Sequence, residues 1–198
     1  NASGELKTKP TQHSVKELRS LGISPDVLVC RSEQELPKDE KKKIALFCSV
    51  PNESVISMQD VDTVYSVPIL LNKQKVDKTI IEKLKIKAKQ PNLNDWKRVV
   101  KAKLMPEKEV NVSFVGKYTE LKDSYKSINE ALEHAGIKNK AKVNINFVEA
   151  ENISSKNIKK TLKNADAVLV PGGFGERGIE GMILACKYAR ENNIPYLG

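Results

Sequence analysis

The clearest combination of strand and loop in the chain is AVLVPGGFG, residues 167–175. Its first four residues are apolar and partly β-branched, which is typical of a central parallel strand covered on both faces. The glycines that follow let the backbone approach a ligand closely and present free N–H groups. Ligands bind beyond the carboxyl ends of strands in open α/β sheets, so we expect a binding loop here. A plain strand-to-helix turn is the alternative, and the pattern alone does not separate the two.

The residues around this loop alternate between strand and helix patterns, in the order β-α-β-α-β-α-β. That order predicts a parallel sheet with helices on its faces. The expected strands are residues 110–114, 143–147, 167–170 and 194–197, and the expected helices are 123–135, 155–162 and 179–189. Gly136 is expected to stop the first of these helices. The last helix is expected to bury an apolar stripe of Ile179, Met182, Ile183, Cys186 and Ala189.

The first half of the chain also mixes helices and strands. A polar loop over residues 7–12 is expected to precede a helix that begins at the capping-box pattern of Ser14 and Glu17 and ends at Gly22. A buried strand is expected at residues 27–30. Further expected elements are a helix over 37–48 with an acidic first turn, a short strand over 54–57 and a helix over 76–84.

These patterns divide the chain into three parts. Residues 1–90 form the first domain, residues 91–108 a connector and residues 109–198 the second domain. Pro91 and Pro106 bracket the connector, whose residues 92–104 are expected to be helical. Because the chain stops at Gly198 directly after a strand, we expect it to be a fragment of a longer protein.

Composition narrows the class of protein. The chain has 198 residues and a formal charge of +9, carried by widely spread lysines. It has neither an apolar run of about 20 residues nor zinc-finger or RNA-binding signatures, so membrane spanning and direct nucleic-acid readout are not expected. Three cysteines make no disulfide framework and indicate a reducing compartment. Cys30, Cys48 and Cys186 lie in apolar contexts and are expected to be core thiols.

The segment Lys7–Gln12 carries two cations, two hydroxyls and an amide within six residues. That mixture suits a polyphosphate with a sugar or base beside it, although many exposed loops have a similar composition. Lys43 stands where a charged run meets an apolar one, and a lysine at the edge of the core is its default interpretation. The residues include no complete catalytic constellation.

Several blocks of the chain, in the same order, resemble CTP synthase. They are Gly4–Leu18, Pro25–Arg31, Lys43–Cys48, Val115–Tyr118, Ser124–Ser127, Val170–Gly178 and Asn193–Gly198. The resemblance implies the end of a P-loop-type synthetase domain followed by the first half of a class I glutaminase domain.

The same resemblance implies an activity. It is the ATP- and Mg²⁺-dependent amination of UTP to CTP, with ammonia from glutamine hydrolysis and GTP as allosteric activator. It also implies a homotetramer in the cytoplasm. The family's ATP phosphate loop would lie upstream of Lys7, and its nucleophilic cysteine just after Gly198. We therefore expect this fragment alone to be inactive and to hold no metal site.

Motif matching assigns roles to individual residues. UTP and the inhibitor CTP would be held by Lys7, Thr8, Lys9, Pro10, Thr11, Gln12 and Lys43. The ATP adenine would lie beside Gln59, Asp60 and Val61, although the family often has lysine where Gln59 stands. Gly172 and Gly173 would bind glutamine and its oxyanion, and Phe174 and Arg177 would be linked to GTP activation.

Two other interpretations stay open. One is a catalytically inactive nucleotide-binding or assembly module of the same family, and the other is a different class I amidotransferase. The residues Lys7–Gln12 count against the second. The identity of the residues after Gly198 would separate the enzyme from the inactive module.

Overall fold

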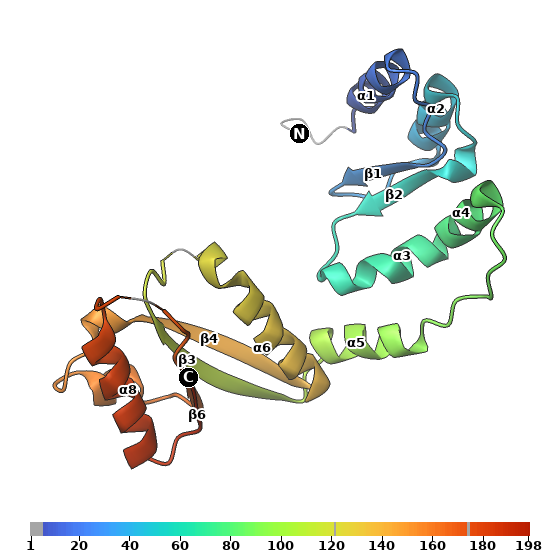
Figure 1. Ribbon diagram of the computed structural model, residues 1–198. Helices are drawn as coiled ribbons and strands as arrows, with labels where there is room; N and C mark the ends of the chain where they lie inside the picture. The colour runs from blue at the N-terminus through green and yellow to red at the C-terminus, as the bar shows by residue number, and fades with distance from the viewer. Residues whose placement is uncertain (1–5, 121, 174) are drawn as a thin grey trace. The chain divides into compact units, whose positions relative to one another are not determined.

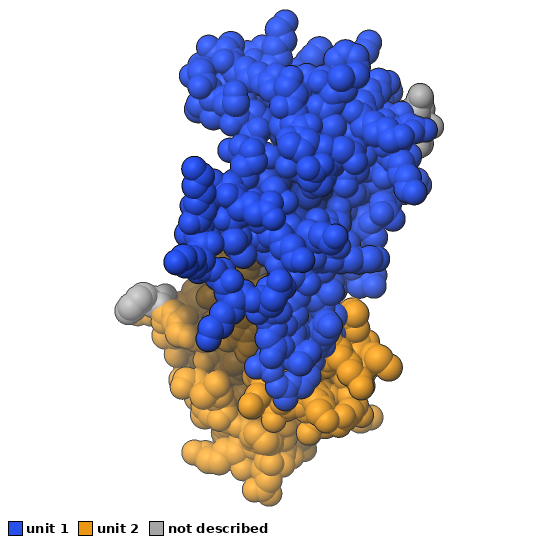
Figure 2. Space-filling model, turned by 90° about the vertical axis from the view of Figure 1, so that its right-hand side faces the viewer, with its two compact units in different colours: residues 1–100 blue, residues 101–198 orange. Residues whose placement is uncertain are grey.

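The computed structural model describes residues 6–120, 122–173 and 175–198, and within them it contains two parallel β-sheets. Each sheet belongs to one of two units, residues 1–100 and 101–198, which are coloured separately in Figure 2. Helices cover the sheets in both units (Figure 1). The α/β class expected from the sequence is therefore confirmed. No helix within the described residues is long and apolar enough to cross a membrane.

Unit 1 is built on a two-stranded sheet. The strands β1 (Leu28–Ser32) and β2 (Val55–Gln59) pair in parallel, with Leu28 opposite Val55. Helices α1 (Lys9–Ser20) and α2 (Lys38–Cys48) lie on one side of this sheet, and α3 (Val67–Lys73) and α4 (Val76–Leu84) on the other (Figure 1). Helix α5 (Asn94–Leu104) follows. Short 3₁₀ turns occupy residues 52–54 and 64–66.

The core of unit 1 lies between α1, α2 and the sheet. Ile44 and Cys48 of α2 are almost completely buried, and they pack with Val15 of α1 and Val55 of β2. These residues recur on the inner faces of their helices at the spacing that an amphipathic helix requires. The packing holds both helices against the sheet and so fixes the position of the first turn of α1.

The direction of α1 follows from its contacts with α2. Helix α2 leads from the carboxyl end of β1 to the amino end of β2, so it begins at the carboxyl edge of the sheet. At its far end, the Arg19 guanidinium donates to the carbonyl oxygen of Cys48 at 2.6 Å and to the hydroxyl of Ser49 at 3.4 Å. Arg19 is in the last turn of α1. The carboxyl-terminal ends of α1 and α2 thus lie next to each other. Both helices begin on the side of the carboxyl edge of the sheet.

A side chain closes the outer edge of β2. The Gln74 carboxamide, just after α3, accepts from the Ser57 backbone N–H at 2.9 Å and donates to the Ser57 carbonyl oxygen at 2.7 Å. The Ser57 hydroxyl accepts from the Leu36 N–H at 2.9 Å. Gln74 therefore makes the two hydrogen bonds that a neighbouring strand would make.

Unit 2 has a four-stranded parallel sheet. Its strands are β3 (Lys108–Gly116), β4 (Ala141–Glu149), β5 (Ala167–Leu169) and β6 (Tyr196–Leu197), in the order β4-β3-β5-β6. The helices are α6 (Lys126–Lys138), α7 (Ile158–Thr161) and α8 (Ile179–Glu191), with 3₁₀ turns at 122–125 and 150–152. Since every pair in this sheet is parallel, the four carboxyl ends share one edge.

Alternate residues of β3 pack on opposite faces of this sheet. Phe114 is fully buried on the α6 side, where its ring centroid lies 4.6 Å from that of Tyr125 and 5.2 Å from that of Phe147. Val115 is fully buried on the other side, in a cluster with Ala185 and Ala189 of α8. Both faces of the central strands are therefore covered, as the apolar sequence of β5 predicts.

Two glycines of unit 2 allow helices to approach their neighbours closely. A Cβ atom at Gly136 would lie 2.6 Å from the carbonyl oxygen of Ala141, and one at Gly181 would lie 1.8 Å from that of Ala150. The expectation that Gly136 ends its helix is wrong, because α6 continues to Lys138. Packing against the start of β4, rather than a helix end, accounts for the glycine there.

Three other local predictions need correction. Helix α1 begins at Lys9, with Thr8 as N-cap and a proline in the first turn, so it starts before Ser14. The strand predicted as buried is half-exposed, because the Val29 side chain faces solvent at 55% exposure. In α8 the buried residues are Gly181, Ala185 and Ala189, and much of the predicted stripe, including Ile183, is exposed. Helix α3 was not predicted.

Candidate functional site

The glycine loop follows β5 at the carboxyl edge of the unit 2 sheet, as predicted. The Val170 N–H donates to the Leu197 carbonyl oxygen at 2.9 Å, which sets the ends of β5 and β6 side by side. Gly172 and Gly173 are both exposed. A Cβ atom at either position would meet no atom of the described residues within 4 Å, and neither residue has a left-handed φ. Within the described part of the chain, neither packing nor backbone conformation requires glycine at these two positions.

A buried lysine holds the far end of this loop. The Lys117 ammonium donates to the carbonyl oxygen of Gly175 at 2.9 Å, and the lysine is 7% exposed. The Tyr125 hydroxyl donates to the Lys117 carbonyl oxygen at 2.6 Å. Gly175 itself has φ +82°, a conformation that favours glycine. Lys117 directly follows β3, so the exit of that strand is tied to the glycine loop.

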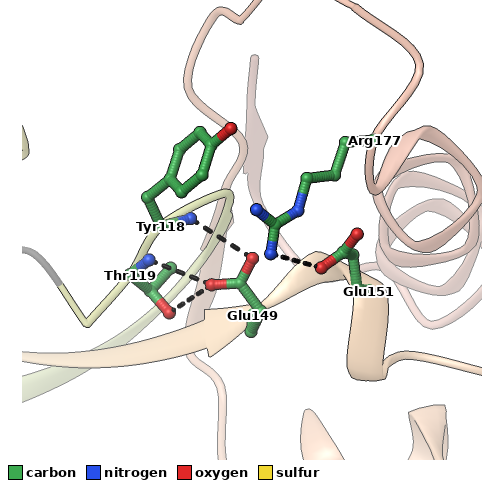
Figure 3. Close-up of polar contacts among 5 residues, drawn as sticks. All are labelled: Tyr118, Thr119, Glu149, Glu151 and Arg177. Carbon is green, nitrogen blue, oxygen red and sulfur yellow. Dashed lines mark hydrogen bonds and ion pairs between the residues drawn. The ribbon is translucent and has the colours of Figure 1, made fainter.

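Arg177 makes a second link at the same edge (Figure 3). Its guanidinium pairs with Glu151 at 2.6 Å and lies over the Tyr118 ring, 4.7 Å from the centroid. Hydrogen bonds with Glu151 and with Tyr118 raise the pKa of Arg177, so its charge is fixed. Both side chains of the ion pair are close to half exposed. An anionic ligand in solution can therefore reach the guanidinium.

Glu149 caps the loop that leaves β3 (Figure 3). Its carboxylate accepts from the N–H of Tyr118 at 3.2 Å, and from the N–H and hydroxyl of Thr119 at 3.0 and 2.9 Å. Partial burial alone would raise the pKa of Glu149, but these hydrogen bonds and the charge of Arg177 outweigh it and lower the pKa. The ionised carboxylate thus stabilises the carboxyl edge.

We expect Glu149→Gln to lower the stability of unit 2 at neutral pH by about 1 kcal/mol, less than the roughly 1.5–3 kcal/mol of a charged hydrogen bond because the site is half-exposed. The pKa of Glu149 is lower in the folded chain than its usual value of about 4.3 in the unfolded chain. Its contribution is therefore complete above that value and is lost as the pH falls through the folded pKa. Urea unfolding from pH 7 to pH 3 should show the two proteins converging at the acid end. A constant difference across that range, or one matched by exposed Glu120→Gln, would contradict the assignment.

The predicted triphosphate segment forms the beginning of α1. Lys7 and Lys9 are exposed, whereas Thr8 is 6% exposed. The Gln12 amide donates to the Thr8 hydroxyl oxygen at 3.1 Å, which leaves the hydroxyl proton free to be donated. A helix N-terminus with two flanking lysines attracts anions through its unpaired N–H groups and their charge. Helix α1 thus contains the last four residues of the segment that the sequence predicts as a loop, Lys9–Gln12, and only Lys7 and Thr8 precede it.

The other predicted nucleotide contacts also belong to unit 1. Lys43 is exposed and lies one turn before Phe47 on α2. Phe47 and Gln12 line the same surface hollow between α1 and α2. Asp60 directly follows β2, where its N–H donates to the Ser32 carbonyl oxygen at 3.0 Å and its carboxylate pairs with Arg31 at 3.1 Å.

The structure thus places the two predicted groups on one side of unit 1. Gln59, Asp60 and Val61 stand at the carboxyl edge of the sheet, and Lys7–Gln12 lie at the ends of α1 and α2 that face that side. Gln59 and Val61 are half-buried, whereas Asp60 is exposed. Phe174 lies outside the described residues. Cys48 is fully buried as expected, but Cys30 and Cys186 are half-exposed, and all three are free thiols.

The sequence analysis assigned no role to Lys117, Tyr118 or Glu149. Their hydrogen bonds to one another's loops and to the glycine loop span 30 to 58 residues of the chain, so no local pattern reveals these contacts. The sequence does indicate where Lys117 lies. It follows the predicted strand 110–114 after Val115 and Gly116, so it is expected at the carboxyl edge of the sheet.

The parallel sheets and their helices define an α/β protein, with a glycine loop at the carboxyl edge of the larger sheet. Residues 120–198 match the family model of class-I glutamine amidotransferases, and residues 1–86 match that of the CTP synthase N-terminus. The first part of the chain therefore matches the CTP synthase N-terminus, and the second part matches the class-I glutamine amidotransferases.

A solved structure is similar to part of the chain. It is described as Trypanosoma brucei CTPS, glutaminase domain with bound acivicin. The two are 38% identical, over 44% of this chain and 34% of that chain, with a TM-score of 0.41. The chain spans about a third of the length of that structure.

Proposed function

We propose that the protein containing this chain makes CTP from UTP, using ATP and Mg²⁺ for activation and glutamine as the nitrogen donor. The observation that carries the proposal is the presence, in one chain and in this order, of a CTP synthase N-terminus and a class-I amidotransferase domain. Residues 120–198 would belong to the part that releases ammonia, and residues 1–86 to the part that uses it.

The glycine loop suits the release of ammonia. A thiolate that attacks the glutamine carboxamide turns its carbonyl oxygen into an oxyanion, which needs N–H donors. Gly172 and Gly173 supply backbone groups in open space at the sheet edge. Leu197 ends at the same edge beside Val170, so a nucleophile directly after Gly198 would lie near the loop. Collapse of the intermediate expels ammonia and leaves a thioester, which water hydrolyses.

The first turn of α1 suits the pyrimidine nucleotide. Lys7, Lys9 and the N–H groups of the turn would bind the triphosphate of UTP, or of the inhibitor CTP, with Thr8, Pro10, Thr11, Gln12 and Lys43 completing the site. Transfer of the ATP γ-phosphoryl group to O4 of uracil creates a leaving group. Ammonia then forms the bond to C4 as the C4–O bond breaks and phosphate leaves.

The ATP and metal contacts are assigned more sparingly. The adenine would lie beside Gln59, Asp60 and Val61 at the end of β2. Mg²⁺ would supply charge neutralisation at the transferred phosphoryl group. Within the described residues, no group of three His, Cys, Asp or Glu side chains is arranged to hold a metal ion.

Activation by GTP is the third part of the proposal. Arg177 offers a fixed positive charge beside the glycine loop, close to half exposed and stacked on Tyr118. A nucleotide phosphate or base held there would act directly on the loop that binds glutamine. Phe174 is proposed as its companion by its place in the sequence. We also propose a homotetramer in the cytoplasm, as the family resemblance implies.

The direct test is CTP formation by the full-length protein. We expect CTP from UTP and ATP with either glutamine or ammonium salts, and stimulation by GTP with glutamine alone. Omission of ATP should abolish the product with both nitrogen sources. Binding of UTP without CTP formation from either source would instead identify a catalytically inactive module.

Replacement of Lys7 and Lys9 by glutamine should raise the KM for UTP at least about tenfold, because charged hydrogen bonds contribute about 1.5–3 kcal/mol each. The double variant should also be inhibited less by CTP, since the same triphosphate contacts are lost. The matched control is Lys87→Gln with Lys89→Gln, which removes two exposed lysines at the same spacing in the same unit. Equal UTP and CTP kinetics in the two double variants would remove the nucleotide assignment.

A further inference from the structure

Lys117 combines burial with a hydrogen bond to the functional loop. It directly follows Gly116, the last residue of β3, and is 7% exposed. Its ammonium donates to the Gly175 carbonyl oxygen at 2.9 Å. Burial of an ammonium group costs free energy that its hydrogen bonds must offset. An apolar side chain of similar length would fill the same space without that cost, so packing alone does not explain a lysine here.

The glycine loop depends on its two ends for its shape. At one end Pro171 is buried and packs close to Gly116, where an added Cβ would lie 3.2 Å from the proline ring. At the other end the Gly175 carbonyl is held by Lys117. Between these ends, no atom of the described residues lies within 4 Å of the positions where the Cβ atoms of Gly172 and Gly173 would lie. Packing around these two glycines therefore does not fix the directions of their N–H groups.

The two attachments of the far end differ in strength. The ion pair of Arg177 with Glu151 is close to half exposed, so water and salt weaken it. In the contact of Lys117 with Gly175 the lysine is buried and the glycine exposed, so the hydrogen bond is partly shielded from solvent and is weakened less. This contact is thus the better protected of the two restraints on the far end of the loop.

We propose that Lys117 is a positioning residue for glutamine hydrolysis. By fixing the Gly175 carbonyl, it fixes the course of the glycine loop and so the orientation of the N–H groups that meet the oxyanion. This role rests on the proposed function of the loop. It predicts that Lys117 matters for the release of ammonia and not for its use, because the amination of UTP does not involve the loop.

The test compares two nitrogen sources in the full-length protein with Lys117→Met. We expect kcat/KM for glutamine to fall about 10- to 100-fold, mainly through kcat, because a misplacement of about 1 Å can cost about 100-fold. CTP formation from ammonium salts should stay within about twofold, and the melting temperature should not fall. Lys117→Arg, which restores a donor, should recover part of the loss. Lys159→Met, which removes an exposed lysine of α7, is the matched control.

The outcomes separate this role from the proposed function. Equal losses with glutamine and ammonium, or no loss with either, would overturn the role of Lys117 while leaving CTP synthesis established. A wild-type protein that makes CTP from neither source would overturn the proposed function and the role together. If Lys117→Met does not fold, Lys117→Arg is tested instead. A loss of about threefold or more with glutamine but not with ammonium supports the role. The same change relative to the wild type with both nitrogen sources overturns it.

Discussion

Gly173→Val in the full-length protein is expected to lower glutamine-dependent CTP formation by about 100- to 1,000-fold, because displacing the carboxamide from the loop should cost as much as losing an oxyanion donor. A branched side chain at this position would project into the open space at the sheet edge, where the glutamine carboxamide is proposed to bind. Formation of CTP from ammonium salts should change little, because that reaction needs no oxyanion at this loop. The ratio of the two rates is the measurement.

The surroundings of Gly173 make this result informative. Because no atom lies within 4 Å of the added Cβ, the substitution should not strain the folded chain. A melting temperature close to that of the wild type is the expected control result. Equal loss with both nitrogen sources would point to a folding defect and count against the oxyanion assignment.

Gly181→Ala should destabilise unit 2 by about 3 kcal/mol or more. The new methyl carbon would lie 1.8 Å from the Ala150 carbonyl oxygen, so α8 or the turn after β4 must move by more than 1 Å. Backbone shifts of this kind in packed regions cost about 1–3 kcal/mol and sometimes more. Without this contact, alanine would stabilise a helix interior by about 1 kcal/mol relative to glycine. The sign of the change is therefore decisive.

Urea unfolding of the chain, monitored by circular dichroism, measures this effect. Gly172→Ala is the matched control, because the same methyl group there meets no atom within 4 Å and should change stability little. A Gly181→Ala protein at least as stable as the wild type would show that α8 does not approach Ala150 this closely.

The order of strands and helices in unit 2 could be predicted from hydrophobic periodicity. The alternating apolar residues of β3 and β4, the apolar run of β5 and the helices between them appear where that periodicity places them. Boundaries were less accurate, since α6 begins at Lys126 and continues through Gly136. The sequence alone does not distinguish a glycine that permits close packing from one that ends a helix. At Gly136 the distinction comes from β4, which packs against it.

Unit 1 shows the same limit at the start of α1. The pattern of Ser14 and Glu17 is typical of a helix start, yet Ser14 lies inside the helix and its hydroxyl donates to the Pro10 carbonyl oxygen at 3.1 Å. Pro10 fixes a helical φ and needs no hydrogen-bond acceptor in the first turn, which explains the earlier start. The chain thus offers two helix-start signals, and the helix begins at the one that contains the proline.

The candidate site likewise contains some residues that the sequence reveals and others that it does not. Residues that act through their own backbone or local charge, such as Gly172, Gly173 and Lys7, could be singled out from the sequence. Residues that act through a distant partner could not, because Lys117 reaches Gly175 across 58 positions. Contacts of that kind depend on which strands become neighbours, and the spacing of residues along the chain does not contain that information.

The carboxamide of Gln74 gives the small sheet of unit 1 a preferred direction of extension. Both main-chain groups of Ser57 are already hydrogen-bonded to Gln74, so an added strand cannot pair with them. Such a strand would instead pair with β1, at the other edge of the sheet. A shorter side chain at position 74 would leave a second edge of the sheet, at β2, with unpaired main-chain groups. Strands of other molecules could then add there, and the protein would tend to self-associate.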